Sequence, residues 1–136
     1  GVEVDVSGVE GVWVMGGQIR LQHVLMNLIG NALDAAVAAS ASPGIWITVA
    51  QTEETVTIAV EDNGPGIPEK IRPRIFDPFF TTKEVGQGLG LGLSISYNVV
   101  KDFGGSIGAG EASEGGARLV VTLRRSEPPT RREAAE

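Results

Sequence analysis

The sequence predicts an α+β fold, a two-layer sandwich in which helices cover one face of a mixed, largely antiparallel sheet. Several short stretches alternate apolar and polar residues, as half-buried strands do. One long stretch, from Gln18 to about Ala39, instead has its apolar residues at helical spacing. Strands that follow one another directly favour hairpins, whereas a doubly wound parallel sheet needs a helix after nearly every strand.

The N-terminal part is expected to hold two strands and the long helix. VEVDV at 2–6 alternates apolar and polar residues, and the short VWV at 12–14 is interpreted in the same way. The helix from Gln18 to about Ala39 is followed by Ser-Pro-Gly at 42–44, which ends it.

The middle of the chain predicts a hairpin followed by a loop. The strands IWITVAQ at 45–51 and VTIAVED at 56–62 are joined by a tight polar turn at 53–55. The turn-rich residues 63–68 then precede a short helical segment near Glu69 to Ile75.

The C-terminal part begins with residues 77–90, whose small and flexible residues predict a mobile loop. Helical spacing resumes from Ser94 to Phe103, and Gly104-Gly105 ends that helix. The final pair of strands is expected at 106–110 and 117–124.

Length and composition limit the classes of function. A chain of 136 residues fits one domain, which we place at 1–125, and the Pro-containing tail 126–136 is expected to be disordered. The net charge of −6 and the lack of a basic cluster within 1–125 argue against nucleic acid as a ligand. Without cysteine there is no disulfide or thiolate metal site. The chain opens without methionine, so we expect it to be a piece of a longer protein.

Three polar residues of the long helix form one stripe. Asn27, Asn31 and Asp34 lie at i, i+4 and i+7, and their neighbours on that side are apolar. Buried amides cost free energy unless they are hydrogen-bonded, so these side chains need a partner. Two kinds of partner fit these side chains: a polar network against the hairpin, or a ligand such as Mg²⁺, which amide oxygens can coordinate.

Asp62 ends the strand at 56–62 and is followed by Asn-Gly-Pro-Gly-Ile. A carboxylate at this place could accept a hydrogen bond from the exocyclic amine of a flat heterocycle. The alternative is an Asx-turn, in which the side chain bonds its own backbone two residues on.

A glycine run, GQGLGLGLS at 86–94, stands directly before the second helix. Glycine costs about 1 kcal/mol in a helix interior, so the run must serve another purpose. A flexible linker is disfavoured by the leucines, which leaves a loop whose N–H groups approach an anion. Of the phenylalanines before it, Phe76 is expected to anchor in the core. Lys83 either reaches phosphate or is solvated.

Four segments together resemble the motifs of one family. They are the N box at 27–35, the first glycine box at 62–67, the F box at 76–80 and the second glycine box at 88–93. In this order they resemble the catalytic, ATP-binding domain of bacterial sensor histidine kinases, within the superfamily that includes DNA gyrase B and MutL. The segments FTTK, GLGLGLSIS and DFGG are especially similar to those of the dicarboxylate-transport sensor kinases.

The resemblance implies a Bergerat-type sandwich that binds ATP with Mg²⁺ and transfers the γ-phosphoryl group to a histidine. It implies that Asn31 ligates Mg²⁺, that Asn27 lies near the phosphates and that Asp62 binds the adenine amine, while residues 77–90 form an ATP lid. Catalytic roles fall to Asn27, Asn31 and Lys83. The further nucleotide-binding residues it implies are Asp34, Gly64, Gly66, Ile67, Phe79, Thr82, Lys83, Gly88, Leu89, Gly90, Leu91, Gly92 and Leu93. Leu89 departs from the family, which commonly has threonine there.

The implied partners are ATP or ADP, a histidine-acceptor dimerisation domain of the same full-length kinase, and a downstream response regulator. The full-length protein is expected to be a homodimer, with this chain as a cytoplasmic domain of an inner-membrane sensor.

Three other functions compete: a gyrase-type ATPase, an anti-sigma-factor serine kinase and a non-catalytic nucleotide-sensing module. In hydrolytic relatives a glutamate four residues before the metal-binding asparagine activates water, and here that position is Asn27, which cannot act as a base. The sole histidine, His23, lacks the sequence context of an acceptor and is expected to be a surface or packing residue. The phosphoacceptor is therefore expected on another domain.

Overall fold

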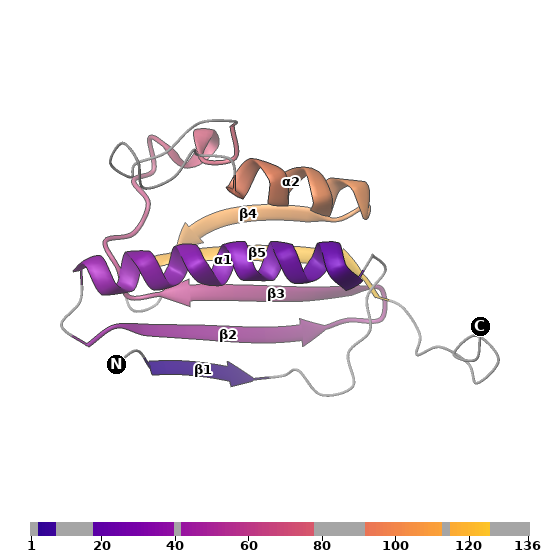
Figure 1. Cartoon of the computed structure of the whole chain (residues 1–136). Coiled ribbons are helices and arrows are strands. Elements are labelled where there is room, and N and C mark those ends of the chain that lie inside the picture. Colours follow the sequence, from indigo (N-terminus) through magenta and orange to yellow (C-terminus); the bar gives the residue numbers. More distant parts are fainter. Residues whose placement is uncertain (1–2, 8–17, 40–41, 78–91, 113–114, 126–136) are drawn as a thin grey trace.

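The computed structural model describes residues 3–7, 18–39, 42–77, 92–112 and 115–125. Figure 1 shows two layers, a sheet and a pair of helices. The elements in chain order are β1 (Glu3–Ser7), α1 (Gln18–Ala39), β2 (Gly44–Gln51), β3 (Thr55–Asp62), the 3-10 helix η1 (Arg72–Arg74), α2 (Gly92–Asp102), β4 (Ser106–Glu111) and β5 (Ala117–Arg124).

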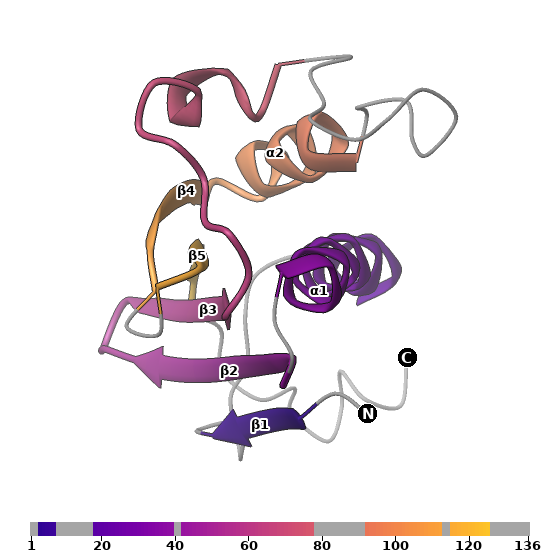
Figure 2. The same cartoon turned by 90° about the vertical axis from the view of Figure 1, so that its left-hand side faces the viewer.

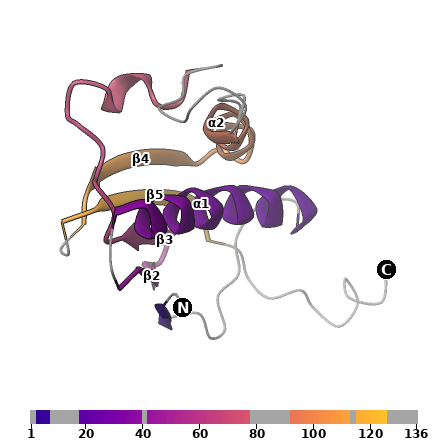
Figure 3. The ribbon, with the colours of Figure 1, turned by 60° about the vertical axis from the view of Figure 1, so that its left-hand side comes forward.

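The five strands form one sheet in the order β1-β2-β3-β5-β4. β1 pairs with β2 in parallel, and the other three pairs are antiparallel. Both helices lie on the same side of this sheet, and α1 runs along its length (Figures 2 and 3). The predicted fold class, a two-layer sandwich with a mixed and largely antiparallel sheet, is confirmed, as is the hairpin of β2 and β3.

The core lies between the sheet and the two helices. On α1, Val24, Leu28 and Ala32 follow one another at every fourth position and are 0 to 2% exposed. Alternate residues of β3 and β5 meet them, among them Val60 and Val121. Each such aliphatic side chain that is fully buried stabilises the fold by roughly 1.5–3 kcal/mol.

The strands differ from their predicted bounds by one residue at most at an end, and larger differences occur at α2 and at the segment near Glu69 to Ile75. α2 begins at Gly92, two residues before the expected Ser94, so the end of the glycine run forms the first helical turn. The helical segment expected near Glu69 to Ile75 is reduced to the 3-10 turn of η1. Pro73 explains this, since it has no N–H to donate to the carbonyl of Glu69, as an α-helix over this segment would require.

α2 ends at Asp102, one residue before the expected Phe103, and the glycines predicted to end it follow directly. Gly104 has a left-handed φ of +77°, and the N–H of Gly105 donates to the carbonyl of Val100, which ends the helix. The strand expected at 12–14, most of the loop at 77–90 and the tail at 126–136 lie outside the described residues. None of the helices in the described ranges is long and apolar enough to cross a membrane.

Candidate functional site

Asp62 is a buried carboxylate at the end of β3, with 4% of its surface exposed. Its Oδ1 accepts hydrogen bonds from two backbone N–H groups, that of Gly64 at 2.9 Å and that of Ala117 at 3.2 Å. The first of these is the Asx-turn that the sequence left open. Because both bonds end on Oδ1, they fix the orientation of the carboxylate and leave Oδ2 as the oxygen that a ligand can use.

Two glycines permit the close packing around this carboxylate. A Cβ on Gly64 would lie 2.5 Å from the carbonyl oxygen of Ala35 in α1. A Cβ on Gly116, in the turn between β4 and β5, would overlap the backbone carbonyl of Asp62. The end of β3 is therefore held between α1 on one side and the β4–β5 turn on the other.

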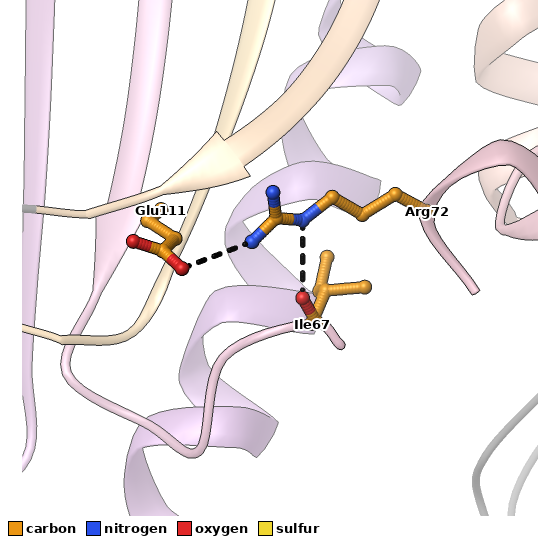
Figure 4. Close-up of polar contacts among 3 residues, drawn as sticks. All are labelled: Ile67, Arg72 and Glu111. Atoms are coloured by element: carbon orange, nitrogen blue, oxygen red, sulfur yellow. Dashed lines mark hydrogen bonds and ion pairs between the residues drawn. The ribbon is translucent and has the colours of Figure 1, made fainter. Parts of the chain in front are cut away.

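The loop after Asp62 is anchored at both of its ends. The side chain of Asn63 accepts a hydrogen bond from the N–H of Gly44 and donates one to the carbonyl of Ser42, both at 2.9 Å. At the other end, Arg72 Nε donates to the carbonyl oxygen of Ile67 at 3.1 Å (Figure 4).

The same Arg72 side chain also connects the loop to β4. Its guanidinium lies 3.5 Å from the carboxylate of Glu111, the last residue of that strand (Figure 4). Glu111 is 83% exposed, so this ion pair contributes little to stability, and the bond to Ile67 is the stronger restraint on the loop.

α1 and α2 pack as antiparallel neighbours. Arg20 near the start of α1 pairs with Asp102 at the end of α2 at 2.7 Å, and Asn27 donates to Ser96 Oγ at 3.3 Å. As residue numbers increase along α1, the facing residue numbers therefore decrease along α2. Continued by one helical turn, this register brings the first turn of α2 alongside Asn31.

The polar stripe predicted on α1 is partly covered. Asn27 and Asn31 are half-buried and Asp34 is exposed, and the amide of Asn27 is hydrogen-bonded to α2. His23 is exposed on the helix surface, as expected.

Packing joins the loop after Asp62 to the part of α1 that carries the asparagines. Gly64 packs on Ala35, one turn after Asn31, so the loop that follows Asp62 and the asparagines share the same side of α1. Gly66 and Ile67 lie in that loop, and Gly92 and Leu93 form the first turn of α2. The other candidates, Phe79, Thr82, Lys83, Gly88, Leu89, Gly90 and Leu91, lie outside the described residues.

Phe76 is confirmed as a core anchor. It packs against the hydrophobic core, and its ring centroid lies 5.6 Å from that of Tyr97 in α2. It thereby fixes the point from which the chain leaves towards the segment at 78–91.

Four residues that shape this region were not identified from the sequence: Arg72, Ser96, Gly116 and Ala117. Ser96 is hydrogen-bonded to a residue 69 positions away and Ala117 to one 55 positions away, so neither contact leaves a local pattern. The paired glycines at 115 and 116 were the one visible signal, and alone they indicate only a turn.

The arrangement can bind a flat base and a phosphate chain at neighbouring places. Oδ2 of Asp62 can accept a hydrogen bond from an amine. The first turn of α2 presents backbone N–H groups and the positive end of the helix dipole, which attract phosphate. Among the residues described, no group of three His, Cys, Asp or Glu side chains could hold a metal ion. A metal there would be one that keeps water and ligand oxygens, as Mg²⁺ does.

Comparison with known sequences identifies the family of this chain. Residues 16–127 match the family described as histidine kinase-, DNA gyrase B-, and HSP90-like ATPase. The chain is 42% identical over 112 residues to the C4-dicarboxylate transport sensor protein DctB of Pseudomonas aeruginosa, covering 82% of this chain and 18% of that protein. It is 41% identical over 130 residues to the signal transduction histidine-protein kinase AfsQ2 of Streptomyces coelicolor, covering 93% of this chain and 23% of the relative.

Solved structures with the same fold include the nucleotide-free catalytic domain of histidine kinase ThkA. It superposes with a TM-score of 0.77 and 31% identity over 93% of this chain and 80% of that one. Full-length ShkA in complex with AMPPNP gives a TM-score of 0.76 and 28% identity over 96% of this chain and 27% of that one. The chain spans less than a quarter of the length of the two curated relatives, DctB and AfsQ2.

Proposed function

Since this chain belongs to the histidine kinase-, DNA gyrase B- and HSP90-like ATPase family, as the ATP-binding domain of a sensor histidine kinase, we propose that it transfers the γ-phosphoryl group of ATP to a histidine on another domain. The observation that carries the proposal is the carboxylate of Asp62, which is buried and held by two backbone N–H groups. A fixed, buried acceptor suits one specific donor on a base.

That donor is the exocyclic amine of adenine, and Asp62 Oδ2 accepts its hydrogen bond. The loop that carries Gly64, Gly66 and Ile67 lines the base, and the anchors at Asn63 and Arg72 support this role because they hold both ends of the loop. A charge-assisted hydrogen bond of this kind is stronger than one between neutral groups and gives selectivity for an amine over a carbonyl.

The phosphates extend from the base along α1 towards the first turn of α2. Asn27 contacts the phosphates, Asn31 offers its amide oxygen to Mg²⁺, and Gly92 and Leu93 lie at the helix N-terminus that receives negative charge. When bound, Mg²⁺ supplies positive charge that neutralises the phosphates. Asp34, Phe79, Thr82, Lys83 and the residues Gly88 to Leu91 complete the nucleotide site in this proposal.

The chain positions ATP for transfer rather than for hydrolysis. Asn27 stands where a water-activating base would be needed, and an amide does not take a proton from water. The exposed His23 lies on α1 itself, on the surface of the helix whose half-buried edge carries Asn27 and Asn31. The acceptor histidine is therefore supplied by the dimerisation domain of the same kinase. In this proposal the full-length kinase is a homodimeric, membrane-bound sensor, and it phosphorylates a response regulator.

The test is phosphorylation of a supplied acceptor. The chain is incubated with radiolabelled Mg-ATP and the dimerisation and acceptor domain of its own full-length kinase. Acid-labile, base-stable label on the acceptor domain is expected, because phosphohistidine has that stability. Acid-stable label would instead indicate the serine-kinase alternative, which the sensor-kinase relatives disfavour. ATP binding without any transfer would favour the nucleotide-sensing alternative.

A further inference from the structure

α1 carries a line of exposed apolar residues. In the described ranges four large hydrophobic residues are more than half exposed, and three of them lie on this helix: Ile19 at 69%, Met26 at 69% and Val37 at 58%. Met26 follows Ile19 by 7 residues and Val37 follows Met26 by 11, which is close to two and to three turns of an α-helix. Gly30 lies near the same line, since it follows Ile19 by 11 residues. These four residues form the outer line of α1.

The outer line faces away from the core. Met26 is two residues from both Val24 and Leu28, which are buried, so it lies roughly 160–200° around the helix from each of them. The main contacts of α1 are with α2, β2 and β3, and Figure 2 shows these elements on two sides of the helix. A surface helix normally has charged and polar residues opposite its core face. An apolar line there indicates a contact with another molecule or domain.

The spacing of the outer line is the same in both directions. Its four residues, Ile19, Met26, Gly30 and Val37, are separated by intervals of 7, 4 and 7 residues. Two copies of α1 that run antiparallel therefore place Ile19 of each copy opposite Val37 of the other, and Met26 opposite Gly30. A Cβ at Gly30 would meet no atom within 4 Å, so the space above its bare backbone is open for a long side chain. The line is thus complementary to itself.

We infer that the outer line of α1 is a surface through which two copies of this chain pair, antiparallel and with two-fold symmetry. A two-fold contact uses the same patch on both copies and needs a patch that complements itself. The four residues are uncharged, so two chains that each carry a net charge of −6 can meet here without opposing like charges in the contact. A membrane surface fits less well, because helices that lie on membranes are rich in lysine and arginine on their polar face.

Pairing through α1 leaves the proposed nucleotide site open. Asn27 and Asn31 each follow a residue of the outer line by one position, which turns them about 100° around the helix. The contact of one helix with another is smaller than the roughly 800 Å² per partner that a stable interface buries. Isolated chains therefore pair weakly, whereas two copies held together in one larger assembly pair readily because their effective concentration is high.

The experiment uses disulfide formation between single cysteines, since the chain has none of its own. Two variants, Ile19→Cys and Val37→Cys, are oxidised separately and as an equal mixture. In the antiparallel pair position 19 faces position 37 of the other copy, whereas the two positions 19 are about 27 Å apart along the helix axis. The mixture should therefore form linked dimers about tenfold faster than either variant alone, since pairing holds the two thiols together.

Ile95→Cys is the matched control, because Ile95 is an apolar residue of α2 that is 51% exposed and lies off the outer line. Its rate of linking measures chance collision. Met26→Glu, added to both cysteine variants, should lower the rate of the mixture to that of Ile95→Cys, because it places a charge against the apolar contact. Circular dichroism checks that each variant is folded.

Two results would overturn the inference. The first is a mixture that links no faster than Ile95→Cys, or that links as fast with Met26→Glu as without it. The second is rapid linking of Ile19→Cys to itself, which would indicate a parallel pair. None of these measurements needs ATP, so their outcome is independent of the proposed function.

Discussion

The backbone N–H of Ala117 donates a hydrogen bond to Asp62 Oδ1 at 3.2 Å, although 55 positions separate the two residues. Asp62 closes β3, and Ala117 opens β5, the neighbouring strand. The carboxylate that we assign to adenine is therefore positioned by strand pairing as well as by its own turn. Variants on either side of this bond should affect nucleotide binding.

Asp62→Asn should abolish most adenine nucleotide binding and leave the fold intact. The asparagine carbonyl can replace Oδ1 and keep both backbone bonds, which puts the NH₂ group where Oδ2 meets the adenine amine. Two donors then face each other, which should cost about 2–3 kcal/mol, or tens-fold in affinity. Calorimetry with ATP and circular dichroism test this. Unchanged affinity would remove Asp62 from the adenine site.

Gly116→Ala should lose both nucleotide affinity and stability. The added methyl group overlaps the backbone carbonyl of Asp62, and overpacking of this kind typically costs about 1–3 kcal/mol. Gly108→Ala is the matched control, because a Cβ at Gly108 in the same hairpin meets nothing within 4 Å. Urea unfolding and ATP titration of both variants measure the effect. Equal behaviour of the two would contradict the packing that holds Asp62.

Asn31→Ala should mainly remove the Mg²⁺-dependent part of ATP binding. Most ligands of Mg²⁺ in such a site are waters and phosphates, so one amide oxygen is the contribution that the protein loses. The measurement is ATP affinity with and without Mg²⁺, with Gln22→Ala, at an exposed position of α1, as the control. If Mg²⁺ strengthens ATP binding to Asn31→Ala as much as to the unmodified chain, the metal role is wrong.

Gly30→Ala should stabilise the protein by about 0.5–1 kcal/mol, the cost of glycine in a helix interior. Gly30 lies in the middle of α1, and a Cβ there meets no atom within 4 Å. The midpoint of urea unfolding should rise while ATP affinity stays constant. A lower midpoint would mean that Gly30 is needed for a close approach.

The isolated chain should bind ATP and yet remain unphosphorylated. Phosphoryl transfer depends on positioning, and a chain without the acceptor domain lacks half of the required geometry. Incubation with labelled ATP, followed by an acid-lability check, tests this, with His23→Ala as the control. Stoichiometric acid-labile label that disappears in His23→Ala would identify His23 as an acceptor.

Most of the fold could be predicted because burial leaves a periodic pattern in a sequence. β5 lies where alternation placed it, at Ala117–Arg124, and α1 spans Gln18–Ala39 as expected. The element ends that were predicted wrongly depend on backbone geometry. In η1, for example, Pro73 prevents a longer helix. Spacing on α1 does not reveal that Asn27 bonds Ser96 of α2, because that contact depends on how the two helices pack.

By itself, the sequence determined the order of strands and helices, the family and the residue types of the candidate site, since each depends on spacing along the chain. Three contacts were decided only by the tertiary structure. The backbone N–H of Ala117 bonds Oδ1 of Asp62, Gly116 packs against the backbone carbonyl of Asp62, and the amide of Asn27 bonds Ser96. The physical reason is that these contacts join distant segments. They exist only once β5 has paired with β3 and α2 has packed against α1.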